Sequence, residues 1–307
     1  MKLPSSLITS AIALILATGI LGCAKKPKTV RAGNRSAAVL LASGEEALKQ
    51  GKWEEGRKLL RLIEEDMPSS PEFPKAKLLI GDSFFFADKA SYPEAAVEYQ
   101  NFLGYFPRHE MRDYALYHIA LCHYVTIPDA ERDQASTRLA LTAFQNLLRE
   151  ALGSHYAGEA KTKITQCWRR LAESELMVGI FYAKSRQFTA AETRLKGMLE
   201  AYPEYADRER AYYYLGSALR QKNIDSVMAE RLERDFRTKI GKDSYAKLTN
   251  AEEKQFKSEL EAYKAEEVAK YRQEAREHFQ RLVESYPKSR WTKLAKHELS
   301  EMGKNKG

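Results

Sequence analysis

The chain has 307 residues, of which 44% are hydrophobic and 30% charged, a balance that excludes a wholly disordered protein and one that crosses a membrane many times. Glycine and proline number only 16 and 10, which disfavours an all-β fold of short strands and tight turns. The net charge of +8 does not indicate nucleic-acid binding, because six basic residues lie in the first 35 positions and residues 36–307 carry only +2.

Residues 1–22 have the organisation of a bacterial signal peptide. Lys2 precedes an apolar run, Leu7 to Leu21, that is too short for a comfortable transmembrane helix. The run ends in Ile20-Leu21-Gly22-Cys23, which resembles a lipobox. The resemblance implies cleavage before Cys23, lipidation of its thiol, and a lipidated basic linker over residues 23–35 that contacts the membrane. Ala24 after the cysteine implies an outer-membrane address. The alternative is an ordinary signal or an uncut anchor in which Cys23 is incidental.

A repeated pattern runs through residues 36–307. Five segments share one frame, in which a small residue lies three positions after the start and, in four of them, a proline lies fifteen positions after it. Each segment has the apolar stripe of a helix; the small residue lets a neighbouring helix approach, and proline stops the helix. The segments start at Trp53, Tyr92, Thr137, Phe188 and Arg272; the small residues are Gly56, Ala95, Ala140, Ala191 and Ala275; the prolines are Pro68, Pro107, Pro203 and Pro287, with Leu152 in the third segment.

A second helical pattern with its own small residue precedes the segments, so each unit reads as a pair of antiparallel helices. This arrangement resembles the tetratricopeptide repeat, although the starts are 39 to 84 residues apart rather than about 34. We therefore expect an all-α fold: a tetratricopeptide-like right-handed superhelix of about five helix pairs. Residues 36–221 would hold repeats 1–4 and the start of repeat 5. The preceding small residues are Gly44, Gly81, Ala120, Gly179 and Gly216.

A charged stretch interrupts the last unit. Between Lys222 and Lys270, 22 of 49 residues are charged, and Thr249 followed by Glu252 predicts a capping box at the start of a long helix that runs towards Ser285. We expect a charged helical insertion over residues 222–264, the last repeat helix and a C-terminal helix over 265–302, and a disordered tail over 303–307. The insertion is either a solvated hairpin or an arm that docks a partner.

No catalytic constellation or cofactor motif occurs in the sequence. Gly241-Lys242 lacks the rest of a phosphate loop, and neither HExxH nor GxSxG is present. His118 and Cys122 have the spacing of two metal ligands on one helix face, but no second pair completes a site, which favours a packed or surface role and no bound metal. Cys122 and Cys167 lie in separate helical stretches and predict no disulfide framework.

Clusters of aromatic residues are the candidates for a ligand-binding groove. At helical spacing most members of such a cluster belong to the core. Three aromatic residues in succession, as at 84–86, cannot all face inward, however, and exposed rings make peptide-binding platforms. The candidate groove residues are Phe84, Phe85, Tyr114 and Tyr117.

The lipobox, the basic linker and five degenerate units together resemble the BamD family of the β-barrel assembly machinery, also called the YfiO or ComL type. The similar stretches include Leu41–Trp53, Leu147–Tyr156 and Arg194–Leu199 followed by Tyr202-Pro203. The resemblance implies a non-enzymatic, lipid-anchored scaffold on the periplasmic face of the outer membrane. It further implies that the N-terminal repeats bind unfolded β-barrel proteins, that the C-terminal repeats contact a BamA-like barrel subunit through Arg194, and that other assembly lipoproteins are partners.

Two other readings of the sequence remain open. The first is a different tetratricopeptide lipoprotein of the cell envelope, either a pilotin for a secretin or pilus, or a coordinator near peptidoglycan. The second is an enzyme in which the repeats are a side feature, which the lack of a second domain disfavours. Co-purification after mild detergent extraction separates the BamD-type reading from the pilotin, because the first predicts a BamA-like subunit and the second predicts a secretin.

Overall fold

The computed structural model of the chain describes residues 35–205, 207–239 and 249–304, which form twelve α-helices and no strand within those ranges. The signal peptide and Cys23 lie outside the described residues. The helices are α1 (Ala37–Lys49), α2 (Trp53–Asp66), α3 (Phe73–Phe85), α4 (Tyr92–Tyr105), α5 (Arg112–Tyr124), α6 (Ala135–Glu150), α7 (Ala157–Lys184), α8 (Phe188–Ala201), α9 (Arg208–Gln221), α10 (Ser226–Lys239), α11 (Asn250–Ser285) and α12 (Arg290–Lys304).

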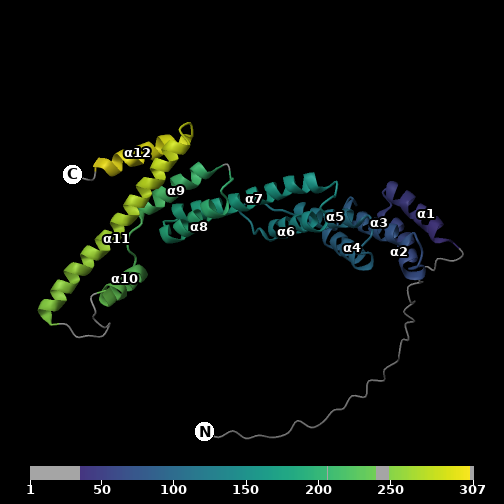
Figure 1. Ribbon diagram of the computed structural model, residues 1–307, viewed down its shortest axis with the longest axis horizontal. Coiled ribbons are helices and arrows are strands. Elements are labelled where there is room, and N and C mark those ends of the chain that lie inside the picture. The colour runs from purple at the N-terminus through teal and green to yellow at the C-terminus, as the bar shows by residue number, and fades with distance from the viewer. Residues whose placement is uncertain (1–34, 206, 240–248, 305–307) are drawn as a thin grey trace, which may run out of the picture.

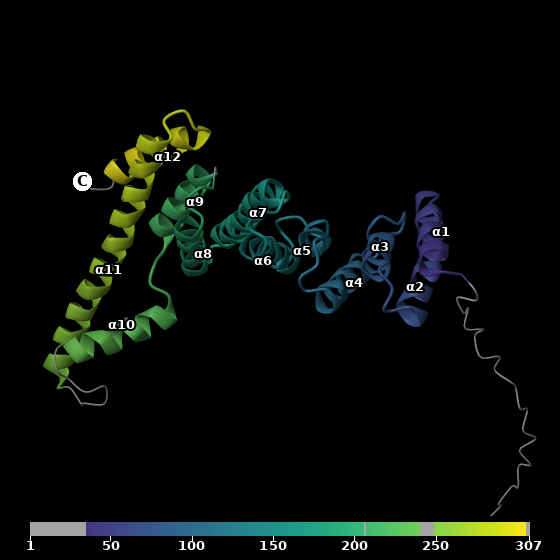
Figure 2. The same cartoon turned by 45° about the vertical axis from the view of Figure 1, so that its right-hand side comes forward.

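The helices stack as pairs along an elongated molecule, with α1 at one end and α12 at the other (Figure 1). The pairs α1/α2, α3/α4, α5/α6 and α7/α8 follow the chain, and most contacts as far as α9 are between helices adjacent in the sequence. The fifth pair joins α9 to α11, and α12 packs against both (Figure 2). The all-α, tetratricopeptide-like fold expected from the repeats is confirmed.

In the helix pairs, a large side chain of the second helix faces a small residue of the first helix, and this match in size explains why the two helices pack together. The residue seven positions after each segment start of the repeat frame is fully buried, at 0% exposure: Leu60, Tyr99, Phe144, Leu195 and Phe279. In four units it meets a glycine of the first helix, where an added Cβ would lie only 2.6–2.8 Å from the nearest atom of that side chain. Each large residue therefore packs directly on backbone that only glycine leaves open. These glycines are Gly44, Gly81, Gly179 and Gly216.

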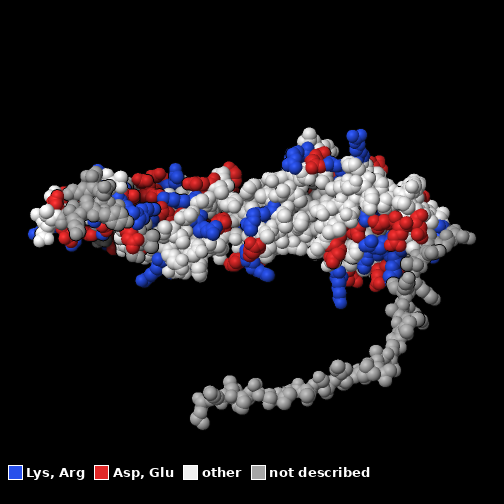
Figure 3. All heavy atoms as spheres, turned by 90° about the horizontal axis from the view of Figure 1, so that it is seen from below, with Lys and Arg blue, Asp and Glu red and all other residues white. Residues whose placement is uncertain are grey.

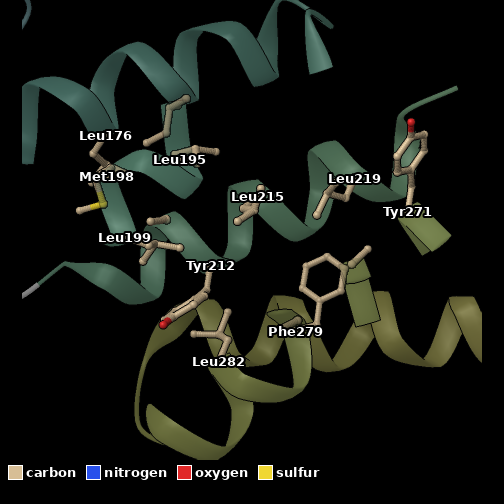
Figure 4. Packing of buried hydrophobic residues seen from close by; sticks show 14 of the residues in the cluster. Leu176, Leu195, Met198, Leu199, Tyr212, Leu215, Leu219, Tyr271, Phe279 and Leu282 are labelled. Carbon is tan, nitrogen blue, oxygen red and sulfur yellow. The ribbon is translucent and has the colours of Figure 1, made fainter. Parts of the chain in front are cut away.

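The fifth unit shows the same match at the C-terminal end. Phe279 and Leu282 of α11 point towards Leu215 and Tyr212 of α9 (Figure 4). Gly216 lies one residue beyond Leu215, and its Cβ position is 2.7 Å from the Phe279 ring. The α9–α11 contact is thus built like the others, although the two helices are far apart in the sequence.

The helix ends follow the predicted proline positions. α2, α4, α8 and α11 each end two residues before their proline, and the intervening residue caps the last turn with its backbone N–H. α6 ends at Glu150 in the same way, with Leu152 in the proline position and 86% exposed. Proline is therefore not required for the turn in the third unit.

The charged insertion is a hairpin of α10 against the N-terminal part of α11. The predicted capping box is present, because Thr249 accepts from the backbone of Glu252 while the Glu252 side chain accepts from the backbone of Thr249. α11 then continues without a break to Ser285, as the long helix predicted from the capping box does. α12 extends to Lys304, two residues into the tail that was expected to be disordered; residues 305–307 lie outside the described ranges.

Candidate functional site

The three aromatic residues at the end of α3 do not all face inward, as expected. Phe84 and Phe85 are half-buried; Arg57 lies over the Phe84 ring at 4.3 Å, and Phe85 packs edge-on against Tyr92 at 5.4 Å. Phe86 is the member that faces solvent, with 52% of its surface exposed. An exposed ring beside two half-buried ones forms an apolar patch at the end of the second helix pair.

Tyr114 and Tyr117 occupy different environments on α5. Tyr114 is half-buried, and its ring stacks on His118 with centroids 4.0 Å apart. Tyr117 is only 5% exposed and stacks on Tyr156 at 4.3 Å, next to Phe144. The assignment of Tyr117 to an open groove is therefore wrong, because its face of α5 points into the core shared with α6 and α7.

A partly buried carboxylate, Asp82, joins α3, α4 and α5 next to this aromatic patch. Asp82 accepts hydrogen bonds from the hydroxyls of Tyr99, at 2.6 Å, and Tyr114, at 2.7 Å. Burial raises the pKa of Asp82, and the two hydroxyl bonds and nearby His118 oppose that rise. Burial and the Asp82 carboxylate both raise the pKa of Tyr99 and of Tyr114. The hydroxyls therefore stay protonated and hold the rings in place.

His118 and Cys122, the spaced pair on α5, are packed residues. The His118 ring nitrogen lies 3.0 Å from the Tyr114 carbonyl oxygen, and burial lowers the pKa of His118. Cys122 is a buried free thiol, and burial raises its pKa to about 12. In the part of the chain that the structure describes, no group of three His, Cys, Asp or Glu residues could hold a metal ion.

Arg194 lies on α8 next to fully buried Leu195, at the edge of the apolar stripe that packs against α7. Its side chain is 49% exposed and forms an ion pair with Glu175 of α7 at 3.0 Å. Gly197, one turn further along α8, has open space at its Cβ position. The guanidinium and its partner are thus accessible on the outer surface of the fourth helix pair.

Two charged networks are buried between helices, and no pattern within a single helix predicts them. Lys77 is 2% exposed and lies 2.6 Å from both Glu64 and Glu98. In the C-terminal half, Lys222 is 5% exposed and lies 2.6 Å from Glu192. Within a single helix, a lysine is expected at the surface. Lys77 is buried because its carboxylate partners come from the two neighbouring helices, α2 and α4.

The face of the molecule seen in Figure 3 carries intermingled charges rather than a field of one sign. Figure 3 shows lysine and arginine next to aspartate and glutamate, with broad uncharged areas between the groups. This distribution agrees with the net charge of only +2 for residues 36–307. Among the described helices, none has the length and apolar composition needed to cross a bilayer.

Stacked helix pairs with exposed aromatic and charged patches define a helical-repeat scaffold for protein interactions, of the tetratricopeptide type. The sequence matches the model of the YfiO family, described as outer membrane lipoprotein, over residues 34–234. Because this match covers more than half of the chain, the protein belongs to the YfiO family.

Several relatives carry the name "Outer membrane protein assembly factor BamD". The protein of Caulobacter vibrioides is 29% identical over 208 residues, which cover 67% of this chain and 68% of the relative. The protein of Haemophilus influenzae is 29% identical, covering 64% of this chain and 78% of the relative. The Rickettsia prowazekii protein is 28% identical, covering 68% of this chain and 82% of the relative.

Proposed function

We propose that this protein is the BamD-type subunit of an outer-membrane protein assembly machinery, acting as a non-enzymatic scaffold. The observation that carries the proposal is the family match over residues 34–234, together with relatives named as outer membrane protein assembly factors. The stack of helix pairs supports it, because repeats of this kind present extended surfaces to other proteins.

Depletion of the protein in cells tests this function directly. We expect several unrelated β-barrel proteins to fall together in the outer membrane, while lipoproteins and periplasmic proteins keep their levels. Loss of one secretin alone, with the other barrels unchanged, would instead support a pilotin and overturn the proposal.

The lipid anchor is the second part of the proposal. Cys23 at the end of the lipobox would be acylated, and acyl chains buried in the outer membrane would hold the scaffold on its periplasmic face. We expect Cys23→Ala to lose fatty-acid labelling and to be released from membranes. Continued labelling of this variant would remove the lipoprotein assignment without affecting the role of the helix pairs.

Arg194 would bind a BamA-like barrel subunit through its periplasmic domains. Its planar guanidinium can form a two-pronged bond with a carboxylate, a geometry that lysine lacks. We expect Arg194→Glu to weaken this binding at least tenfold, which is a modest loss for a charge reversal at an interface hot spot. Arg149→Glu, which reverses an exposed charge on α6, is the matched control. Unchanged affinity of Arg194→Glu in a titration with the purified domains would contradict the assignment.

The aromatic patch formed by Phe84, Phe85, Phe86 and Tyr114 would bind unfolded β-barrel substrates. Phe84, Phe85 and Tyr114 are half-buried and shape the patch, whereas Phe86 is free to contact a ligand. We expect Phe86→Ala to reduce binding of a peptide from a β-barrel C-terminal strand, with Phe181→Ala on α7 as the control for an exposed ring. Equal loss in both variants would contradict a specific site.

A further inference from the structure

The last helix, α12, has an open face at the C-terminal end of the stack (Figures 1 and 2). Its buried side, with Thr292, Ala295 and Met302, packs on α9 and α11. Eight of its residues are exposed; none of these is acidic, and four are cations: Arg290, Lys293, Lys296 and Lys304. An end helix needs a polar outer face to keep a repeat stack soluble, but that need does not explain a face of one sign.

This end of the molecule is basic, unlike the rest of the folded chain. Residues 286–304 contain five lysine or arginine residues and two glutamates, a net charge of +3. The neighbouring turns of α11, residues 277–285, add two glutamates and one arginine, which brings the charge of the whole end to +2. Because residues 36–307 together carry +2, the remainder of the folded chain is neutral overall.

The lysines of this end are unpaired, whereas the glutamates of α12 are not. The two glutamates are bound to Arg220 of α9 and to Lys304, each at 2.8 Å. Three lysines form no ion pair or hydrogen bond with another described residue: Lys288, Lys293 and Lys296. They can therefore attract a negatively charged surface without giving up an existing bond.

The shape of this face fits a membrane better than a peptide. Four cavities of about 450–690 Å³ among the described residues are lined by residues 51–264, and none of them involves α12. A helix without a groove beside it presents a broad surface. Leu294, 44% exposed, lies among the lysines, and Arg290 lies over the Trp291 ring at 4.7 Å. Cations with an exposed apolar side chain between them match lipid head groups above a hydrocarbon layer.

We propose that the outer face of α12 binds the surface of a membrane that contains anionic phospholipids. Lys293 and Lys296 contact lipid phosphate groups, and Leu294 reaches between the head groups. The contact goes beyond the proposed function, because it involves neither Arg194 nor the aromatic patch of α3. It is weak by itself, since stable attachment to a membrane takes two signals, which agrees with the expected release of Cys23→Ala. In the lipid-anchored protein, it brings the C-terminal end of the scaffold onto the membrane.

Sedimentation with lipid vesicles tests this contact. The protein is residues 23–307 with Cys23→Ala, so that no acyl chain contributes to binding. The vesicles contain either phosphatidylcholine alone or one part phosphatidylglycerol to two parts phosphatidylcholine. We expect binding to the anionic vesicles only, weakening as salt is added. Since each cation near an anionic surface strengthens binding about fivefold, Lys293→Ala combined with Lys296→Ala should weaken it about 25-fold.

Two matched double variants separate this face from general attraction. Lys49→Ala with Lys161→Ala removes the same charge from exposed positions on α1 and α7, and Lys293→Arg with Lys296→Arg keeps the charge on α12. Both should bind the anionic vesicles like the parent protein. All variants keep the basic residues 25–35, which also attract anionic lipid, so a difference between variants reports on α12.

Four results would overturn the proposal. They are no binding to the anionic vesicles, equal binding to both kinds of vesicle, unchanged binding after the two alanine substitutions on α12, and an equal loss in the variant of α1 and α7. Binding of fluorescein-labelled octaglutamate without binding of vesicles would assign this face to an acidic protein instead. None of these results bears on the lipidation of Cys23 or on the outer-membrane assembly role, which fatty-acid labelling and depletion test separately.

Discussion

The contact between Gly81 and Tyr99 makes a sharp test of how the helix pairs are held together. A methyl carbon added at Gly81 would lie 2.7–3.0 Å from three atoms of the Tyr99 ring, whereas ordinary contacts begin near 3.4 Å. The ring cannot swing aside freely, because Tyr99 is fully buried and its hydroxyl is bound to Asp82 at 2.6 Å. Gly81→Ala must therefore displace α3 from α4 or break the Asp82 hydrogen bond.

Two opposing effects set the size of the change in unfolding free energy. Alanine in a helix interior is about 1 kcal/mol more favourable than glycine. Overpacking of a core costs about 1–3 kcal/mol, and a strained hydrogen bond to a carboxylate costs up to about 2 kcal/mol more. We expect Gly81→Ala to destabilise the protein by about 2 kcal/mol, which lowers the melting temperature by about 5 °C.

Gly197→Ala is the matched control. Gly197 lies in the interior of α8 with nothing within 4 Å of its Cβ position, so only the helix preference acts, and the melting temperature should rise. Thermal unfolding followed by circular dichroism measures both variants. If Gly81→Ala melts at or above the wild-type temperature, the size match between the paired helices does not hold them together.

Two further predictions concern ionisable side chains that lie wholly or partly in the interior. Lys77→Met should destabilise the protein by about 3 kcal/mol because it leaves Glu98 buried without its closest cation; a double variant with Glu98→Met should recover most of that loss in chemical denaturation, and no recovery would argue against a coupled pair. Burial lowers the pKa of His278 below its ordinary value of 6.5, so the unfolded chain binds more protons as the pH falls below that value. The contribution of His278 to the free energy of unfolding is therefore fully present above pH 6.5 and is lost as the pH falls through the lower pKa of the folded state. His278→Gln should flatten this decline of the unfolding free energy with falling pH, measured by chemical denaturation. His297→Gln, at an exposed position, should leave the decline unchanged.

The sequence predicts the helix pairs well because their determinants are local. The small residue three positions after each segment start lies in the second helix, and the proline follows the last turn of the same helix, so their spacing is visible in the sequence. The starts of α2, α4 and α8 coincide with the predicted Trp53, Tyr92 and Phe188. The capping box at Thr249 locates the start of α11 for the same reason.

The candidate site depends on contacts that no local pattern contains. Tyr117 and Tyr114 are three residues apart on α5, yet one is buried against Tyr156 and the other is half-exposed above Asp82. Their environments are set by the rotation of α5 against α3, α4 and α7. The burial of Lys77 likewise arises from carboxylates contributed by α2 and α4, which a single-helix pattern cannot reveal.

The part of the chain after the family match supplies the second helix of the fifth helix pair. The family match ends at residue 234, inside α10, yet the apolar face of α9 is covered by Phe279 and Leu282 of α11. Arg272 reinforces this contact, because it donates hydrogen bonds of 3.0 Å to the carbonyl oxygens of Leu219 and Lys222 at the end of α9. Without the second half of α11, the fifth unit would have a first helix and no partner. The inserted hairpin of α10 and the first half of α11 is therefore joined to a helix that the fifth pair needs. The second half of that helix, α11, packs on α9.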